Sequence, residues 1–385
     1  MKVAQKLSQI APFKVMELLA RANELAGQGH DVIHLEVGEP DFPTPSPILE
    51  AGHAALTAGK TKYTDARGLI ELRQAVCAHY WQRFNVDVAS ERVFITAGAS
   101  GGLLLLTAAL LNGGDNLLMT DPGYPCNRHF LTAFGAEGRL VPVGPGQNYQ
   151  ITPDLIERYW NENTRGVLLA SPANPTGSVI SSEEMREISK VVNQRQGLVI
   201  VDEIYQGLLY DNLSPSSVLQ VDDDALVINS FSKYFGMTGW RLGWIVVPES
   251  IAGDVEKLAQ NLFICPSTIA QHAALAAFDE AALVEMESYR QAFEERRDYL
   301  VPAISAMGFK VHAMPKGAFY VYAELPDRES ESESFCQRLL EEQYVAITPG
   351  TDFGFQGAKR HVRISYARAM PQLMEAVKRI GSMLQ

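Results

Sequence analysis

Three polar residues of this sequence, Asp202, Lys233 and Asn174, each follow closely on an apolar segment. A buried lysine is costly unless it is neutralised, paired or chemically used, and a Schiff base with an aldehyde is one such use. A carboxylate beside a pyridine nitrogen would keep that nitrogen protonated and make the ring an electron sink. An aspartate at the end of one buried strand and a lysine at the end of another therefore point to chemistry between an amine and a carbonyl group.

Strands that end at one edge of a sheet are needed to bring these side chains together. Short apolar segments are predicted to be strands at 93–98, 116–125, 138–143, 166–177, 197–205, 225–233 and 242–248. Helical segments alternate with them, one from Gly101 to about Asn112 and another opened by a capping box of Ser181 and Glu184. This alternation indicates parallel pairing with both faces of the sheet covered. Such α/β sheets bind ligands just beyond the carboxyl ends of their strands.

The pattern changes beyond Glu280, where one helix of about 25 residues is predicted. A helix of that length often bridges two domains. The chain of 385 residues is also long for one hydrophobic core. We therefore expect a large domain over 46–285 and a small domain made of 1–45 and 286–385.

Composition narrows the class of protein further. The formal charge is −12 and the pI is near 5.2, and an acidic surface argues against broad contact with nucleic-acid backbones. The longest apolar stretch, 103–111, is too short to span a bilayer, and the N-terminus lacks a signal-peptide core. The four cysteines are scattered, without disulfide-like or CxxC spacing. We expect a cytoplasmic protein with no nucleic-acid partner, no membrane partner and no metal.

The most specific piece of sequence is SFSKYFGMTGWRLGW at 230–244. It resembles the lysine motif of the class I/II pyridoxal 5'-phosphate-dependent aminotransferases, of fold type I in the aspartate aminotransferase superfamily. Arg241 lies eight residues after Lys233, as that family's pattern requires. Segments TAGAS, DPGYP, SPANPTG, DEIY and HVRISYA match the same family in the same order. The resemblance implies a mostly parallel seven-stranded sheet between helices, plus a smaller α+β domain.

The same resemblance implies pyridoxal 5'-phosphate as the cofactor, held by Lys233. A helix N-terminus and an arginine fork both suit its phosphate group. The family's phosphate ligands fall on Gly98, Ala99, Ser100, Ser230, Ser232 and Arg241. The family's contacts to the ring fall on Tyr124, Asn174, Asp202 and Tyr205.

Each ring contact has an implied role. Tyr124 resembles the aromatic residue that stacks on the ring, and Asp202 would stabilise the protonated ring nitrogen. Asn174 and Tyr205 resemble the two hydrogen-bond partners of the phenolic oxygen, which stabilise the phenolate. Tyr63, in KYTDARG, resembles the tyrosine that reaches across a dimer interface to the partner's phosphate. That resemblance implies a homodimer with shared active sites.

Three residues resemble the family's substrate contacts. Arg363 would pair with the α-carboxylate of the substrate, Gly38 would offer it a backbone N–H, and Asn174 lies beside them by position in the family. Arg363 and Gly38 belong to the expected small domain, which would therefore close over the substrate.

The side-chain pocket is less well defined by the sequence. Phe13 and Val15 lie near it by position in the family and favour neutral or aromatic side chains over aspartate. Lys14 and Arg128 are candidates for binding a distal carboxylate, and solvated surface charge is the alternative for both.

The resemblance implies a transaminase of amino-acid metabolism and biosynthesis, acting on amino acids and 2-oxo acids such as 2-oxoglutarate or pyruvate. Lys233 would form an aldimine with the cofactor and then move the substrate Cα proton as general base and acid, leaving pyridoxamine phosphate. Asp202 and Tyr205 complete the catalytic set.

Two other functions stay open at this point. A C–S β-lyase or a decarboxylase of the same fold would share Lys233, Asp202 and Arg241, although MTGWRLG and RISYA favour transaminases. A regulator that senses pyridoxal phosphate would need an added DNA-binding domain, usually N-terminal, whereas the resemblance begins within about ten residues of Met1.

Overall fold

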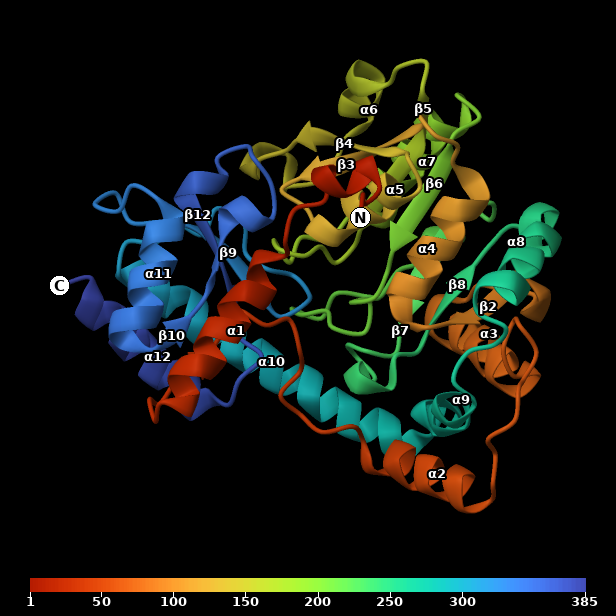
Figure 1. Cartoon of the computed structure of the whole chain (residues 1–385), viewed down its shortest axis with the longest axis horizontal. Coiled ribbons are helices and arrows are strands. Elements are labelled where there is room, and N and C mark those ends of the chain that lie inside the picture. The colour runs from red at the N-terminus through yellow and green to blue at the C-terminus, as the bar shows by residue number, and fades with distance from the viewer.

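The computed structural model describes all 385 residues and shows a large sheet flanked by helices beside a smaller group of strands and helices (Figure 1). Seven strands form the large sheet in the order β2-β8-β7-β6-β5-β3-β4. Their bounds are β2 Val93–Thr96, β3 Asn116–Asp121, β4 Glu137–Pro142, β5 Thr164–Ala170, β6 Leu198–Asp202, β7 Leu226–Ser230 and β8 Gly243–Val246. Each strand overlaps a segment predicted from the sequence, so the mostly parallel seven-stranded α/β sheet is confirmed.

One strand departs from the parallel pairing that we expected. β8 runs antiparallel to both β7 and β2, whereas the pairs among β3, β4, β5, β6 and β7 are parallel. Residues 231–242, between β7 and β8, contain no α-helix and only the short 3₁₀ helix Thr238–Trp240. Without a helical crossover, the chain returns beside β7 in the opposite direction. The connecting loop carries both Lys233 and Arg241.

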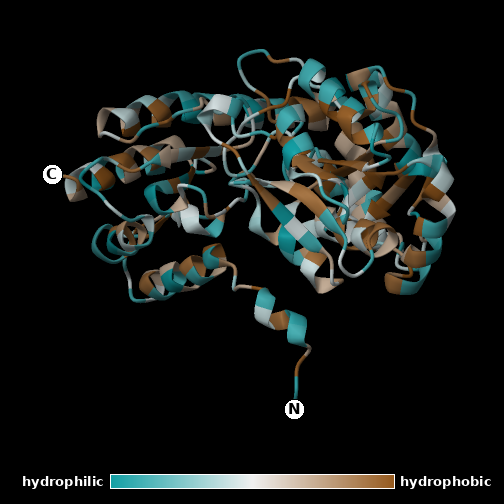
Figure 2. Cartoon of the chain, turned by 90° about the horizontal axis from the view of Figure 1, so that it is seen from above, coloured by the Kyte–Doolittle hydropathy of each residue, from teal (hydrophilic) through white to brown (hydrophobic).

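Both faces of the large sheet are buried, which explains why its strands are continuous apolar runs. In β6, Val199 and Val201 pack into an apolar core of 72 buried residues. Ile200, between them, points to the other face and packs into a second core of 18 residues. Figure 2 shows the strands of this sheet largely in brown, with teal on the outer turns of the covering helices.

Twelve α-helices surround the sheets. They are α1 Lys14–Gly27, α2 Ser46–Thr57, α3 Ile70–Phe84, α4 Gly98–Leu110, α5 Pro125–Ala133, α6 Pro153–Tyr159, α7 Ser182–Asn193, α8 Glu249–Leu262, α9 Thr268–Leu275, α10 Glu280–Ala306, α11 Ser332–Gln343 and α12 Met370–Met383. The capping box of Ser181 and Glu184 is present at the start of α7, and α10 is the expected long helix of 27 residues. α4 begins three residues earlier than predicted, because its first turn is polar and carries no apolar periodicity.

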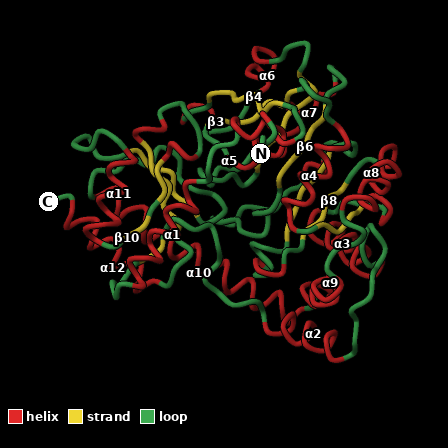
Figure 3. Tube along the Cα trace, viewed as in Figure 1, coloured by secondary structure: helices red, strands yellow, loops and turns green.

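The smaller group of strands lies at the other end of α10, as the separate yellow segments of Figure 3 show. β11 Thr348–Pro349, β12 His361–Ser365 and β9 Tyr320–Glu324 form an antiparallel sheet in that order. β1 Ile33–His34 pairs in parallel with β10 Val345–Ala346. The domain limits at 45/46 and 285/286 stay a prediction. No helix of the structure is both long and apolar enough to cross a membrane.

Candidate active site

A cavity of about 300 Å³ opens where β5, β6 and β7 end. The last residue of each of these strands, Ala170, Asp202 and Ser230, lines the cavity. The predicted site residues that line it are Gly38, Ala99, Ser100, Tyr124, Asn174, Asp202, Tyr205, Ser230, Ser232, Lys233, Arg241 and Arg363. Residues from both ends of the chain therefore meet at the carboxyl edge of the parallel strands, as the rule for such sheets predicts.

Lys233 projects into this cavity from the loop that follows β7. Its Nζ donates a hydrogen bond of 2.6 Å to the carbonyl oxygen of Gly38. Burial lowers the pKa of Lys233 to about 8, with Glu39 acting to raise it and Arg363 to lower it. A pKa this far below the usual value leaves a much larger neutral fraction near neutral pH than an exposed lysine has, so the amine is more available as a nucleophile or base.

Asp202 ends β6 and is only 6% exposed. Its Oδ1 accepts a hydrogen bond of 3.2 Å from the backbone N–H of Ile204. Burial raises the pKa of Asp202 to about 7, against the smaller lowering effects of that hydrogen bond and of Lys233. A carboxyl group that is buried with so few partners suits a cationic ring nitrogen, which would supply the missing positive charge.

A cradle for an anion lies at the start of α4. A Cβ added at Gly98, whose φ is +70°, would meet Nη2 of Arg241 at 2.5 Å, so the guanidinium group lies against the first turn of that helix. Nη1 of Arg241 donates to Ser232 Oγ at 3.3 Å, and Ser230 Oγ donates to the same oxygen at 2.9 Å. Backbone N–H groups of a helix N-terminus, two hydroxyl groups and an arginine are the donors that a phosphate group prefers.

Arg363 comes from β12 and is 2% exposed. Its Nη1 donates to Oδ1 of Asn174 at 3.0 Å, and its Nη2 donates to the carbonyl oxygen of Glu36. Its Nε is buried without a partner. The guanidinium group packs 4.4 Å from the ring centroid of Tyr320. A buried guanidinium that is bonded only to neutral groups, with its Nε–H free, is suited to pair with a carboxylate.

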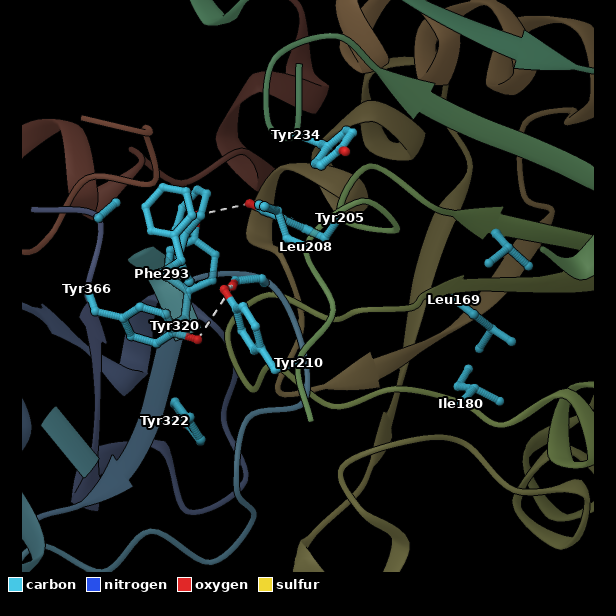
Figure 4. Close-up of a cluster of buried hydrophobic side chains, with 14 of the residues drawn as sticks. Leu169, Ile180, Tyr205, Leu208, Tyr210, Tyr234, Phe293, Tyr320, Tyr322 and Tyr366 are labelled. Atoms are coloured by element: carbon cyan, nitrogen blue, oxygen red, sulfur yellow. Dashed lines mark hydrogen bonds between the residues drawn. The ribbon is translucent and has the colours of Figure 1, made fainter. Parts of the chain in front are cut away.

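Tyr320, in β9, is a site residue that the sequence did not single out. Its hydroxyl oxygen lies 2.9 Å from that of Tyr205, and both side chains are buried within the aromatic cluster of Figure 4. A Cβ added at Gly38 would clash with the Tyr320 hydroxyl, so that loop passes directly over it. In the sequence, Tyr320 belongs to the apolar run AFYVYAEL and has the pattern of an ordinary core strand. The alternation of a strand predicts that Tyr320 and Tyr322 share one face, but it does not indicate that Tyr320 meets Tyr205.

Apolar side chains close the outer part of the cavity. Phe13, Val15 and Met16, at the start of α1, line it together with Tyr124. The rings of Phe13 and Tyr124 meet edge to face, with centroids 6.0 Å apart. Asp352 fixes this end of α1, because its Oδ1 accepts a hydrogen bond of 3.2 Å from the backbone N–H of Lys14.

Two predicted site residues do not line the cavity. Gly98 lies behind it, against Arg241, where a side chain would not fit. Tyr63 is 80% exposed on the surface of the single chain. Its predicted role depends on a second subunit.

The sheet order and a lysine–aspartate site at the carboxyl edge define a transferase of fold type I. The chain belongs to the family of aminotransferases of class I and II, which residues 30–380 match, and it is a transaminase. It is similar to the valine–pyruvate aminotransferase of Mycobacterium tuberculosis, with 39% identity over 97% of each chain. It is also 35% identical to the aspartate aminotransferase of Thermotoga maritima, over 99% of each chain. The solved structure of an aminotransferase from Mycobacterium tuberculosis superposes with a TM-score of 0.96 at 39% identity and covers 100% of this chain and 99% of the other.

Proposed function

We propose that this protein is a pyridoxal 5'-phosphate-dependent aminotransferase that moves an amino group from an amino acid to a 2-oxo acid such as pyruvate or 2-oxoglutarate. One observation carries the proposal: a lysine with its pKa lowered to about 8 shares a cavity with a buried aspartate and a buried arginine that lacks a carboxylate partner. The lysine suits the aldehyde of the cofactor, the aspartate suits its ring nitrogen and the arginine suits the α-carboxylate of the substrate. The cradle formed by α4 and Arg241 suits the phosphate group.

When bound, pyridoxal phosphate supplies an aldehyde that condenses with amines and a ring that takes up the electrons of the broken Cα–H bond. The residues of this chain would provide positioning and proton transfer. The neutral Nζ of Lys233 would take the Cα proton of the substrate and deliver it to C4′, the former aldehyde carbon of the cofactor. Asp202 would hold a proton on the ring nitrogen, and Tyr205 with Asn174 would donate hydrogen bonds to the phenolic oxygen.

Arg363 would set the orientation of the substrate. A guanidinium fork binds a carboxylate through two parallel hydrogen bonds, which fixes both its charge and its angle. The backbone N–H of Gly38 lies on the loop that covers Tyr320 and Lys233 and would bind the same carboxylate.

We propose in addition that two copies of the chain share their active sites through Tyr63. The support is the 80% exposure of this tyrosine in the single chain and its place in the KYTDARG segment. Mixed dimers test this directly. A subunit with Tyr63→Phe would be combined with a subunit carrying Lys233→Ala, and the mixture would be compared with each variant alone. One site in each mixed dimer would then have both changes and the other neither, so activity should return on mixing. No gain over the variants alone would count against shared sites.

Absorbance spectroscopy of the cofactor-loaded enzyme tests the proposed reaction. Addition of an amino acid without an acceptor should convert the absorbance of bound pyridoxal phosphate to that of pyridoxamine phosphate, with one equivalent of 2-oxo acid formed. A C–S β-lyase would instead release a thiol and ammonia, and a decarboxylase would release carbon dioxide, each with the original absorbance restored. Either of those product patterns would replace the aminotransferase proposal with the corresponding reaction.

A further inference from the structure

The cations of the cavity limit the substrates that it can hold. Lys233, Arg241 and Arg363 are the only lysine, arginine or histidine residues among those that line it. Under the proposed function, each already has a group to bind: the aldehyde, the phosphate and the α-carboxylate. A substrate with a second carboxylate, such as aspartate, glutamate or 2-oxoglutarate, would therefore find no further cation on the chain that lines the cavity. A buried charge without a partner is strongly disfavoured.

The wall that faces a substrate side chain is apolar instead. Phe13, Val15 and Met16 enter it from the first turn of α1, and Phe130 enters it from α5. Glu39, at the exposed rim, adds negative charge, since its field raises the pKa of Lys233. A distal carboxylate would thus meet both an apolar wall and a like charge, and an apolar side chain would exchange water for carbon contacts.

The two cations nearest to this wall in the sequence are engaged elsewhere. Lys14 lies between two lining residues of α1, but its Nζ forms an ion pair with Glu333 and a hydrogen bond of 3.0 Å to Thr351 Oγ1. Successive residues of a helix point about 100° apart, so Lys14 faces away while its neighbours face the cavity.

Arg128, on α5, is not among the residues that line the cavity. Its guanidinium group lies 5.4 Å from the ring centroid of the exposed Phe355. Neither of the two cations that the sequence offered for a distal carboxylate therefore lines the cavity.

We infer that both substrates of this enzyme are monocarboxylic: an amino donor with an apolar side chain, and a 2-oxo acid acceptor that is pyruvate or another acid with an apolar side chain. The inference rests on the proposed function, because aminotransfer uses one cavity for donor and acceptor in turn. The same wall meets the acceptor, so we expect it to disfavour oxaloacetate and 2-oxoglutarate as it disfavours aspartate and glutamate. Phe13, Val15 and Met16 are the residues that set this specificity.

Single half-reactions of the loaded enzyme test the inference. Valine, leucine, methionine, phenylalanine, aspartate and glutamate would each be mixed with the enzyme, and the rate of the absorbance change would give kcat/KM. The pyridoxamine form would then be mixed with pyruvate, 2-oxoglutarate and oxaloacetate. We expect the best monocarboxylic substrate to exceed each dicarboxylic one by at least about 100-fold. An apolar pocket rejects even an added hydroxyl group by that order, and it rejects a charge more strongly.

The results of these half-reactions distinguish failure of the substrate inference from failure of the proposed function. If no amino acid changes the absorbance, the proposed function fails. If aspartate, glutamate or 2-oxoglutarate reacts within tenfold of the best monocarboxylic substrate, aminotransfer stands and the inference is overturned. A clear preference for a basic amino acid would also overturn it, since Glu39 would then be the specificity residue.

A gain of function gives a second, independent test. Met16 lines the cavity yet is 55% exposed, so Met16→Arg adds a cation to the wall with little disturbance of the core. The ratio of kcat/KM for aspartate over valine should rise about tenfold or more, the order expected of a hydrogen bond to a charged group. Lys14→Met and Arg128→Met, which remove cations that do not line the cavity, are the matched controls and should change that ratio by less than about twofold. A large fall in dicarboxylate activity with either control would overturn the inference.

Discussion

Replacing Tyr320 with phenylalanine removes one hydroxyl group beside the cavity and leaves the ring in place. That hydroxyl lies 2.9 Å from the hydroxyl of Tyr205, and burial raises the pKa of both tyrosines above the usual value, so both groups are neutral. If Tyr205 donates to the phenolic oxygen of the cofactor, its own oxygen is free to accept a hydrogen bond from Tyr320. Accepting that bond makes Tyr205 a stronger donor, because hydrogen bonds in a chain polarise one another. Tyr320 is thus a positioning residue that acts through Tyr205.

The size of the effect follows from the energy of one neutral hydrogen bond. Such a bond contributes about 0.5–1.5 kcal/mol, and a pKa difference of one unit corresponds to about 1.36 kcal/mol. Donation by Tyr205 favours the deprotonated phenolic oxygen, so weakening it favours the protonated chromophore. The pH midpoint of the visible absorbance of the bound cofactor should therefore move upward by about 0.4 to 1 pH unit in Tyr320→Phe.

A pH titration of this absorbance in the loaded enzyme measures the shift. Tyr205→Phe should move the midpoint upward further, because it removes the direct donor. Tyr322→Phe is the matched control: it lies on the same face of the same strand, and its buried hydroxyl has no hydrogen-bond partner. If Tyr205→Phe raises the midpoint and Tyr320→Phe leaves it unchanged, the coupling between the two tyrosines is refuted.

Three further predictions follow from the geometry of the site. In the cofactor-free protein, burial raises the pKa of Asp202 to about 7. Between about pH 4 and pH 7 the folded state therefore keeps a proton that the unfolded state has lost. The free energy of unfolding falls as pH rises through this range. Asp202→Asn removes this loss of stability, which is at most roughly 4 kcal/mol. The variant should unfold at a higher urea concentration than the parent protein at pH 8 but not at pH 4. The same difference between the two proteins at both pH values would contradict the prediction. Arg363→Lys loses the paired fork and should raise KM for amino acids roughly 30-fold or more, while an unchanged KM in steady-state assays would exclude Arg363 as the carboxylate clamp. Gly98→Ala places a Cβ 2.5 Å from Nη2 of Arg241 at a φ of +70°. Its backbone strain should lower the stability of the folded protein by about 1–2 kcal/mol, and the displacement of Arg241 should weaken cofactor binding in an absorbance titration; unchanged affinity would show that the cradle lies elsewhere.

The strands and the long helix were predictable because burial on both faces leaves a direct mark on the sequence. A strand such as β6 must be apolar at every position when alternate residues enter different cores. The family resemblance, carried by several segments, placed Lys233, Asp202 and Arg363 together, and these residues do line one cavity. The direction of β8 was not predictable from the alternation of strands and helices, because it depends on the absence of a helix from the short segment before it.

Contacts between segments far apart in the chain could not be predicted from the sequence either. Tyr320 and Tyr205 are 115 residues apart, and no local pattern indicates that their hydroxyl groups meet. The directions of Lys14 and Arg128 depend on Glu333, Thr351 and Phe355, which come from the far end of the chain. The substrate preference inferred above depends on these directions, so it emerged only with the structure.

The central claim, that Lys233 anchors pyridoxal phosphate, has one most direct measurement. Borohydride reduction of the loaded enzyme makes permanent any bond between the cofactor and a lysine, and mass spectrometry of the peptides then locates the added group. The account predicts that the group lies on the peptide that contains Lys233, in one copy per chain, and that Lys233→Ala protein carries none. A modified lysine elsewhere, or equal labelling of the variant, would contradict it.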